Sequence, residues 1–561
     1  MQCNTIQYNT LRTSETLLSS SFLPLPPTNR NCCFGSSNSM HTNFCAIPAA
    51  KAAGIHLRSQ KPSAVVENEN KLAMEKRSAG NVRSTHTSAQ KGRIEIERSI
   101  ELFTLSVLDR SAIEEEIHGV RSLAIESHSE TPELIASSLS QFDAELGKIK
   151  RARIGGNGSC SHDVLRNVTT TNSESKITKV SNGIGNGDCY LNDPFFRLRF
   201  LRCELFDAHK ASQRFVRFLE FCSDLFGSFV GERPILIDDL IGGGFKEKKA
   251  LLHSSMQYFP CRDRSGRRVC ADVGLRVTDL PSKQIYKIIT WIHLVATQDI
   301  ETQQKGVVFI VLPSSKGNDG IAKYVTSTEF DSMEYHKKSF ESLPVRVASI
   351  HFCSKDSPFC EEMAYRYFSG VPKDLKIRFK VHQGDHTEIE KSLSGFGIPI
   401  NFLPLTSEGK IKKKVYHRNF VKFHVETEVL LAYKSGYLCS GGTINGQTNG
   451  NDARVDCPRS YDVVFRAGKK HVEHPGNAFM LESIIQSTYH HYVGLRTAKE
   501  KSKFCRRIVT VIENKKIRFL DWDMDRCSWI HIRHPTLMQK KVVQSYLIYA
   551  RKTKREGLSS I

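Results

Sequence analysis

The chain lacks both the cysteine spacing of a metal site and an apolar run long enough to cross a membrane. Its 16 cysteines are scattered, with no C-x-x-C pair and no Cys/His quartet at the spacing that binds zinc. We interpret them as reduced, mostly buried thiols of an intracellular protein. No stretch reaches the roughly 18 apolar residues that a membrane-spanning helix requires. We therefore expect no metal or other cofactor and no transmembrane segment, in a protein that is soluble or at most peripheral to a membrane.

Acidic residues are also missing from a long N-terminal stretch. No Asp or Glu occurs between Thr16 and Val66, and residues 1–98 are rich in Ser, Thr and Asn. Such a composition offers too little apolar surface for a core, so we expect residues 1–98 to be disordered. A Ser-rich, acid-poor N-terminus also fits an organelle transit peptide, and this alternative stays open.

No catalytic constellation stands out either. Asp521, Asp523 and Asp525 alternate, but the glycine and the final glutamate of a calcium-binding loop are missing, so a hairpin turn is the simpler interpretation. The sequence therefore predicts a binding protein rather than an enzyme.

Patterning predicts an α+β chain of alternating folded and linking parts. Apolar residues recur at helical spacing after residue 98, and Thr131 followed by Pro132 is typical of a helix start. These apolar residues are Ile100, Phe103, Leu108, Ile113, Ile117, Val120 and Leu123. The expected parts are a disordered region (1–98), a short helical segment (99–150), a linker (151–190), an α/β lobe (191–410), a basic and then Gly/Asn-rich linker (411–460), a basic domain (461–555) and a tail (556–561).

The central lobe opens with helices and continues with buried strands. Asp193, which precedes a proline, and Asp207 are both typical helix N-caps. The apolar face expected for the second helix contains Phe215, Phe218, Leu219 and Cys222. Val307 to Leu312 is an apolar run of strand length, and Lys376 to His382 alternates strictly between polar and apolar residues. These patterns predict a helical lead-in followed by a sheet.

The same segments resemble the CRAL-TRIO (Sec14-like) lipid-binding family. The run Leu198–Ala211 is similar to the family's helical lead-in, Phe259–Val269 to its first strand and the approach to it, and Lys305–Leu312 to its central strand. The resemblance covers about residues 193–410. It implies an α/β lobe with a helical lead-in and a mostly parallel sheet, which encloses a lipid or other apolar ligand. A lobe whose cavity is filled by side chains, and which serves as a scaffold, is the alternative.

The basic domain carries much of the positive charge of the chain. The whole protein has a formal net charge of +21, and residues 461–555 hold 20 Lys and Arg against 8 Asp and Glu. We expect a helix that starts at His474–Asn477, a second helix capped by Thr497 and Glu500, a hairpin that turns between Asp521 and Cys527, and a last helix from Pro535. The order is helix, helix, hairpin, helix.

Apolar spacing predicts which side of each helix is buried. The expected buried residues are Leu481, Ile484, Ile485, Thr488 and Tyr492 in the first helix, Phe504, Ile508, Val511 and Ile512 in the second, and Met538, Val542, Leu547 and Tyr549 in the last.

This basic domain resembles the domain of unknown function 6824 family, which implies no known activity. The residues that carry the resemblance are Asp462, Val463, Gly468, His474, Pro475, Gly476, Asn477, Arg518, Phe519 and Trp529. Where the family has Gly-Arg-Gly, this chain has Arg466-Ala467-Gly468.

The charge of the domain suggests a polyanion as partner. The residues expected to contact it are Arg466, Lys469, Lys470, Lys499, Lys503, Arg506, Arg507, Lys540 and Lys541. A basic helix beside a hairpin is typical of winged-helix DNA binders, and the helix start at His474–Asn477 could donate backbone N–H groups to a phosphate. Nucleic acid is therefore the first expectation, with a place in the nucleus or cytoplasm. Alternatives are an anionic membrane, on which a lipid-binding or lipid-transfer protein would dock, an acidic protein partner, and a basic face that is simply solvated.

Overall fold

The computed structural model describes most of the chain beyond its N-terminal region. The described residues are 92–123, 130–154, 190–241, 244–273, 280–313, 329–403, 415–434, 454–466 and 474–555. The predicted disordered region lies outside them up to residue 91, and residues 92–103 form a helix. Residues 155–189 of the first predicted linker and the predicted tail 556–561 also lie outside the described residues. In the described stretches, no helix is both long and apolar enough to cross a bilayer.

The described part is α+β, as expected, with helices and two sheets. The larger sheet has the order β1-β2-β3-β4-β5. Its strands are β1 (Met256–Arg262), β2 (Arg268–Asp272), β3 (Val307–Val311), β4 (Val347–Ser354) and β5 (Phe379–Gln383). β1 pairs with β2 in antiparallel orientation, while β2 to β5 are all parallel. The alternating segment predicted from Lys376 becomes a strand only at Phe379, because Lys373–Lys376 forms a helical turn.

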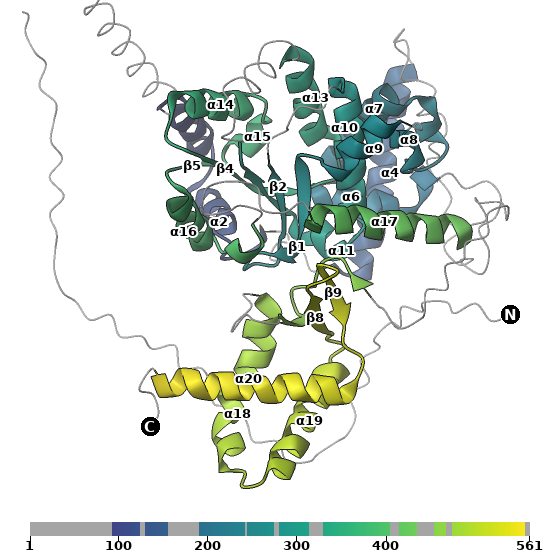
Figure 1. The fold of residues 1–561 in the computed structure, drawn as a ribbon. Helices are drawn as coiled ribbons and strands as arrows, with labels where there is room; N and C mark the ends of the chain where they lie inside the picture. Colours follow the sequence, from purple (N-terminus) through teal and green to yellow (C-terminus); the bar gives the residue numbers. More distant parts are fainter. Residues whose placement is uncertain are drawn as a thin grey trace, which may run out of the picture. The chain divides into compact units, whose positions relative to one another are not determined.

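The helices that connect the parallel strands cover one face of this sheet (Figure 1). The parallel connections advance in one direction across the sheet, and right-handed crossovers then place their helices on the same face. The helices of the lobe and of the segment before it are residues 92–103, α2 (Val107–Ile117), α4 (Pro132–Ile154), η1 (Tyr190–Asn192), α6 (Pro194–Cys203), α7 (Ala208–Phe226), η2 (Ser228–Gly231), α8 (Asp238–Ile241), α9 (Phe245–Leu252), α10 (Ser282–Ala296), α11 (Ile300–Lys305), α13 (Glu329–Ser342), α14 (Pro358–Ser369), α15 (Lys373–Lys376), α16 (His386–Gly395), η3 (Ile400–Phe402) and α17 (Val415–Lys434).

Local signals set the helix starts of the lead-in. The side chain of Asp193 accepts a hydrogen bond from Phe195 N at the start of α6, and Asp207 caps α7 in the same way. Both predicted caps are therefore confirmed. The predicted apolar face of α7 is also buried, with Phe215 and Phe218 meeting Phe200 of α6 at ring-centroid distances of 5.1 and 5.4 Å.

The segment before the lobe attaches through charge as much as through apolar contact. Of the apolar residues predicted there, Ile113 and Ile117 are buried, while Phe103 and Leu108 remain 77% and 81% exposed. Glu116 of α2 is fully buried and accepts hydrogen bonds from Arg346 and Arg378, each at 2.6 Å. Burial by itself would raise the pKa of Glu116, but these two guanidinium groups outweigh it and lower the pKa to about 2.

The smaller sheet belongs to the basic domain and has the order β6-β9-β8-β7. Its strands are β6 (Arg454–Val455), β7 (Val463–Phe465), β8 (Phe519–Asp523) and β9 (Ser528–His531), and its helices are η4 (Asn477–Glu482), α18 (Ser483–Gly494), α19 (Ala498–Asn514) and α20 (Pro535–Arg555). The predicted order of helix, helix, hairpin and helix is found. α20 packs against both α18 and α19 (Figure 1).

The range expected to be a linker, 411–460, differs from the prediction. Residues 415–434 form α17, and residues 454–455 form β6; residues 435–453 lie outside the described residues. The helix α17 has a buried apolar side in addition to its basic residues, since Phe420 and Val421 are buried in the core of the lobe. Charge at the surface of this helix therefore does not indicate a flexible connection.

Candidate polyanion-binding site

The residues that define the basic domain hold its strands together. Asp462 is fully buried and receives two hydrogen bonds from Arg518, at 3.1 and 2.6 Å. Val463 N donates to the carbonyl oxygen of Arg518, and Val463 pairs with Phe519 where β7 and β8 run parallel. A bidentate ion pair thus fixes the register of these two strands.

The His474–Asn477 turn is also structural. Asn477 accepts a hydrogen bond from Val464 N at 2.8 Å and donates one to Val464 O at 2.9 Å, so its amide completes the edge of β7. A Cβ atom on Gly476 would lie 2.0 Å from the carbonyl oxygen of Asp462, which only glycine avoids. His474 donates through Nε2 to Arg459 O, and burial lowers its pKa to about 4.

This helix start is therefore closed to a phosphate. His474, Pro475, Gly476 and Asn477 are all buried. The expectation that their backbone N–H groups could meet a phosphate does not fit this geometry, because β7 and its approach cover them. Gly468 of the same family pattern lies outside the described residues.

The helix α19 presents the exposed cations. Thr497 accepts from Glu500 N at 3.1 Å and donates its own N–H to Glu500 at 2.9 Å, so the predicted capping box is confirmed. Lys499, Lys503 and the pair Arg506–Arg507 follow at intervals of four, three and one residues and are all exposed. At about 100° per residue this spacing places the four on one side of the helix.

The buried side of α19 is rotated from the predicted one. Ile508 and Ile512 are buried as expected, but Cys505 and Val509 complete the face, while Val511 is 50% exposed. Leu547 in α20 is likewise 49% exposed, and Tyr546 is fully buried in its place. In each helix the spacing of apolar residues is compatible with either of two neighbouring faces being buried. The packing of α19 against α20 determines which face is buried.

Two of the predicted polyanion contacts have partners inside the protein. The guanidinium of Arg466 lies 4.7 Å from the ring centre of Phe402 and 5.4 Å from that of Trp522. Lys541 forms an ion pair with Asp521 at 2.7 Å. Lys540 is exposed, and Lys469 and Lys470 lie outside the described residues. The cationic face of α19, defined as Lys499, Lys503, Arg506 and Arg507, is thus exposed, as is Lys540 of α20, and no ion pair engages these side chains in the described chain.

The hairpin β8–β9 packs on the second face of the larger sheet instead of forming a free wing. Trp522 and Trp529 are buried with Phe259 of β1 and Phe402 of η3 in one apolar cluster. Trp529 Nε1 donates to the carbonyl oxygen of Pro260 at 2.6 Å. We call this contact region the seam between the lobe and the basic domain. The two parts are packed together, so the hairpin is not the free wing that a winged-helix DNA binder presents.

Buried charges line the seam as well. Arg262 of β1, which is 1% exposed, bonds to Asp299 and to the carbonyl oxygen of Pro458. Arg268 of β2 pairs with Asp456, which follows β6. Burial by itself would raise the pKa of Asp456, but Arg268 and His424 hold it well below its usual range. Asp456 is therefore an anion at neutral pH, matched to a buried cation.

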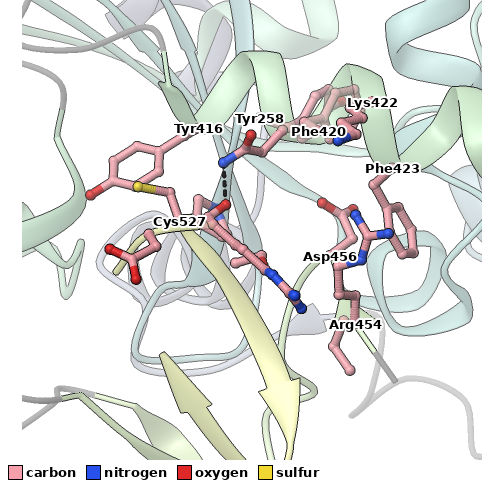
Figure 2. Close-up of a pocket in the computed structure, with 14 residues that line it drawn as sticks. Tyr258, Tyr416, Phe420, Lys422, Phe423, Arg454, Asp456 and Cys527 are labelled. Atoms are coloured by element: carbon pink, nitrogen blue, oxygen red, sulfur yellow. Dashed lines mark hydrogen bonds between the residues drawn. The ribbon is translucent and has the colours of Figure 1, made fainter. Parts of the chain in front are cut away.

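A pocket opens along one side of the seam (Figure 2). Its volume is about 380 Å³. It is lined by Tyr258, Pro260, Tyr416, Asn419, Phe420, Lys422, Phe423, Arg454, Val455, Asp456, Asp525, Arg526, Cys527 and Ser528. The sequence does not predict this pocket, although Tyr416, Phe420 and Phe423 follow one another at helical spacing, because the composition of residues 411–460 indicates a linker. Among the described residues, no group of three or more His, Cys, Asp or Glu is placed to hold a metal ion.

Comparison with known proteins supports the prediction for the basic domain. A search of curated proteins finds no match to this chain. Residues 462–546 match the family model described as a domain of unknown function (DUF6824), so the basic domain is similar to that family, as the sequence indicated.

Proposed function

We propose that this protein is a non-enzymatic binding protein that holds nucleic acid on the cationic face of α19. The observation that carries the proposal is the exposure of Lys499, Lys503, Arg506 and Arg507 on one side of a 17-residue helix. No ion pair engages these four side chains within the described residues. Of the other basic residues predicted for the site, Arg466 and Lys541 already have partners inside the fold, whereas Lys540 of α20 is exposed.

The dimensions of this face suit a nucleic acid backbone. An α-helix with its side chains is about 10–12 Å in diameter, and the major groove of B-form DNA, which admits such a helix, is about 12 Å wide. Lys and Arg on such a helix can reach phosphates, whose release of counterions makes the affinity depend strongly on salt. The buried side of α19, with Cys505, Ile508 and Ile512, anchors the helix to α20 and keeps the face outward.

For the lobe we infer a divergent CRAL-TRIO-like domain that serves as the platform of the basic domain. Its helical lead-in, its hairpin β1–β2 and its parallel strands β2 to β5 support this inference. The basic domain rests on this lobe through Trp522 and Trp529. The lobe thereby orients α19 relative to the rest of the chain.

One observation favours an anionic membrane as the alternative partner. Val511 of α19 is 50% exposed, and Val493 at the end of α18 is 55% exposed. Apolar side chains near cations are the pattern of a surface that inserts shallowly between anionic lipid headgroups. In that case the protein would be a peripheral lipid-binding or lipid-transfer protein.

A competition experiment separates the two partners. The full chain would be mixed with a labelled random duplex DNA and challenged with unlabelled duplex or with vesicles containing an anionic lipid. A variant in which Lys499, Lys503, Arg506 and Arg507 are all changed to Gln tests the face. Its matched control changes four exposed lysines of the lobe, Lys246, Lys248, Lys249 and Lys391, to Gln, which removes the same charge.

We expect that unlabelled duplex DNA displaces the labelled duplex and that vesicles do not. Of the two variants, only the α19 variant should lose its binding to DNA. Displacement by vesicles at a lower concentration of charge than DNA would assign the face to membranes. Equal losses in the two variants would show that net charge, and not this face, carries the binding.

A further inference from the structure

The pocket along the seam collects two kinds of side chain from separate parts of the chain. Tyr416, Phe420 and Phe423 come from α17, and Tyr258 comes from β1. Figure 2 shows Phe423, Arg454 and Asp456 on one side of the hollow and Tyr416 and Cys527 on the other. A ligand in this space would touch both the lobe and the basic domain.

Aromatic rings line this hollow from both sides. Phe420 is buried and stacks with Tyr258 at a ring-centroid distance of 6.0 Å, while Tyr416 and Phe423 are only half-buried. The two half-buried rings therefore retain surface that no protein atom covers. Such surface favours a planar apolar group, which can lie against an aromatic ring face.

Cations reach the same space from three elements. Lys422 of α17 is exposed, Arg454 of β6 bonds to Glu426 at 2.8 Å, and Arg526 lies in the turn after β8. Asp456, which also lines the pocket, is held by Arg268 and by His424 at 3.3 Å. Its charge is thus matched from behind the wall. Glu426 pairs with Arg454 at 2.8 Å and with Lys422 at 3.9 Å, so these three side chains keep one net positive charge that can attract an anionic group beside Phe423.

We propose that this pocket binds an aromatic phosphate monoester of nucleotide size. The ring would lie against Phe423, and the phosphate would meet Lys422 and Arg454, which together with Glu426 keep one net positive charge. The volume of about 380 Å³ is sufficient for a mononucleotide and falls in the range of ligand sites, roughly 300 to 1,000 Å³. This site is separate from the cationic face of α19 and does not depend on the function proposed for it.

The test uses the full chain and adenosine monophosphate as the probe, with adenosine and ribose 5-phosphate as the two halves. Calorimetry gives the affinities, and tryptophan emission gives a local signal, because Trp522 lies 5.7 Å from the Tyr416 ring. We expect each half to bind at least about tenfold more weakly than the whole. Phe423→Ala and Lys422→Gln should each weaken the nucleotide about tenfold, while Lys391→Gln and the α19 variant should not.

Lys422 is exposed, so Lys422→Gln should leave the fold intact. This variant therefore tests the site even if Phe423→Ala misfolds. The proposal is overturned if adenosine monophosphate does not bind at millimolar concentration. It is also overturned if ribose 5-phosphate binds equally well, or if the α19 variant loses the binding while Lys422→Gln retains it. In the last case the nucleotide would merely be occupying the cationic face.

Discussion

Replacement of Trp529 by alanine should loosen the basic domain from the lobe. Trp529 is 1% exposed, packs with Trp522 and Phe402, and donates its indole N–H to Pro260 O at 2.6 Å. Loss of a buried aromatic side chain costs about 3–5 kcal/mol. The carbonyl of Pro260, left without its donor, adds about 1–3 kcal/mol. We therefore expect a total loss of about 4–8 kcal/mol, which is comparable to the whole stability of a typical domain, about 5–15 kcal/mol.

The assay is chemical denaturation of the full chain followed by far-UV circular dichroism. Trp529→Phe separates the two contributions, because it keeps an aromatic ring and removes only the N–H donor, for an expected cost of about 1–3 kcal/mol. Met524→Ala in the same hairpin is the control, since Met524 is 57% exposed. It should change stability by less than about 0.5 kcal/mol.

Hydrogen exchange shows where the loss acts. Phe259 and Cys261 of β1 share the apolar cluster of Trp529, so the amides of β1 should exchange faster in Trp529→Ala. The reasoning would be refuted if Trp529→Ala cost less than about 1 kcal/mol, a typical value for an average substitution. It would also be refuted if the faster exchange stayed within residues 474–555, because the lobe would then not depend on the seam.

Three further perturbations follow from the structure. Glu116→Gln should lower the unfolding free energy by about 3–5 kcal/mol, because it leaves Arg346 and Arg378 buried without their anion. In the unmutated chain the pKa of Glu116 is lowered to about 2, so the stabilisation by this carboxylate is complete above about pH 4.5 and is lost as the pH falls towards 2. The acid denaturation profile of the variant should lack this loss. Thr497→Ala removes the cap of α19 and should lower the unfolding free energy by about 1 kcal/mol, whereas Thr510→Ala, at an exposed position on the same helix, should lower it less. Equal effects of the two substitutions in thermal unfolding would argue against the capping box. Lys541→Gln should leave the affinity for DNA within about twofold of the parent, because Lys541 is paired with Asp521. If a binding titration showed a loss of affinity as large as that caused by Arg507→Gln, Lys541 would belong to the binding surface.

Local structure was largely predictable from the sequence. The caps at Asp193, Asp207 and Thr497 were each correct, because a side chain that satisfies the first N–H groups of a helix acts within three residues. The apolar run from Val307 became the central strand β3. The order of elements in the basic domain followed from the same kind of short-range signal.

Contacts between distant segments were not predictable in the same way. The donor at Trp529 and its acceptor at Pro260 are 269 residues apart, and no local pattern links them. The aromatic stripe of α17 was visible in the sequence, but basic neighbours such as Lys422 gave the stretch the composition of a linker. For Val511, helical spacing alone allowed burial, and the packing of α19 on α20 decided against it. The partners of Arg466 and Lys541 likewise depend on the tertiary fold.

The dependence of DNA binding on salt tests the central claim most directly. The affinity of the full chain for a random duplex would be measured from about 50 to 200 mM salt, with the four-residue α19 variant and the four-lysine lobe control in parallel. If each of Lys499, Lys503, Arg506 and Arg507 neutralises one phosphate, the slope of log affinity against log salt should differ between parent and variant by about 3.6. The parent should then lose about 150-fold more affinity than the variant over this range, and the control should follow the parent. Parallel slopes for the parent and the α19 variant would contradict the account.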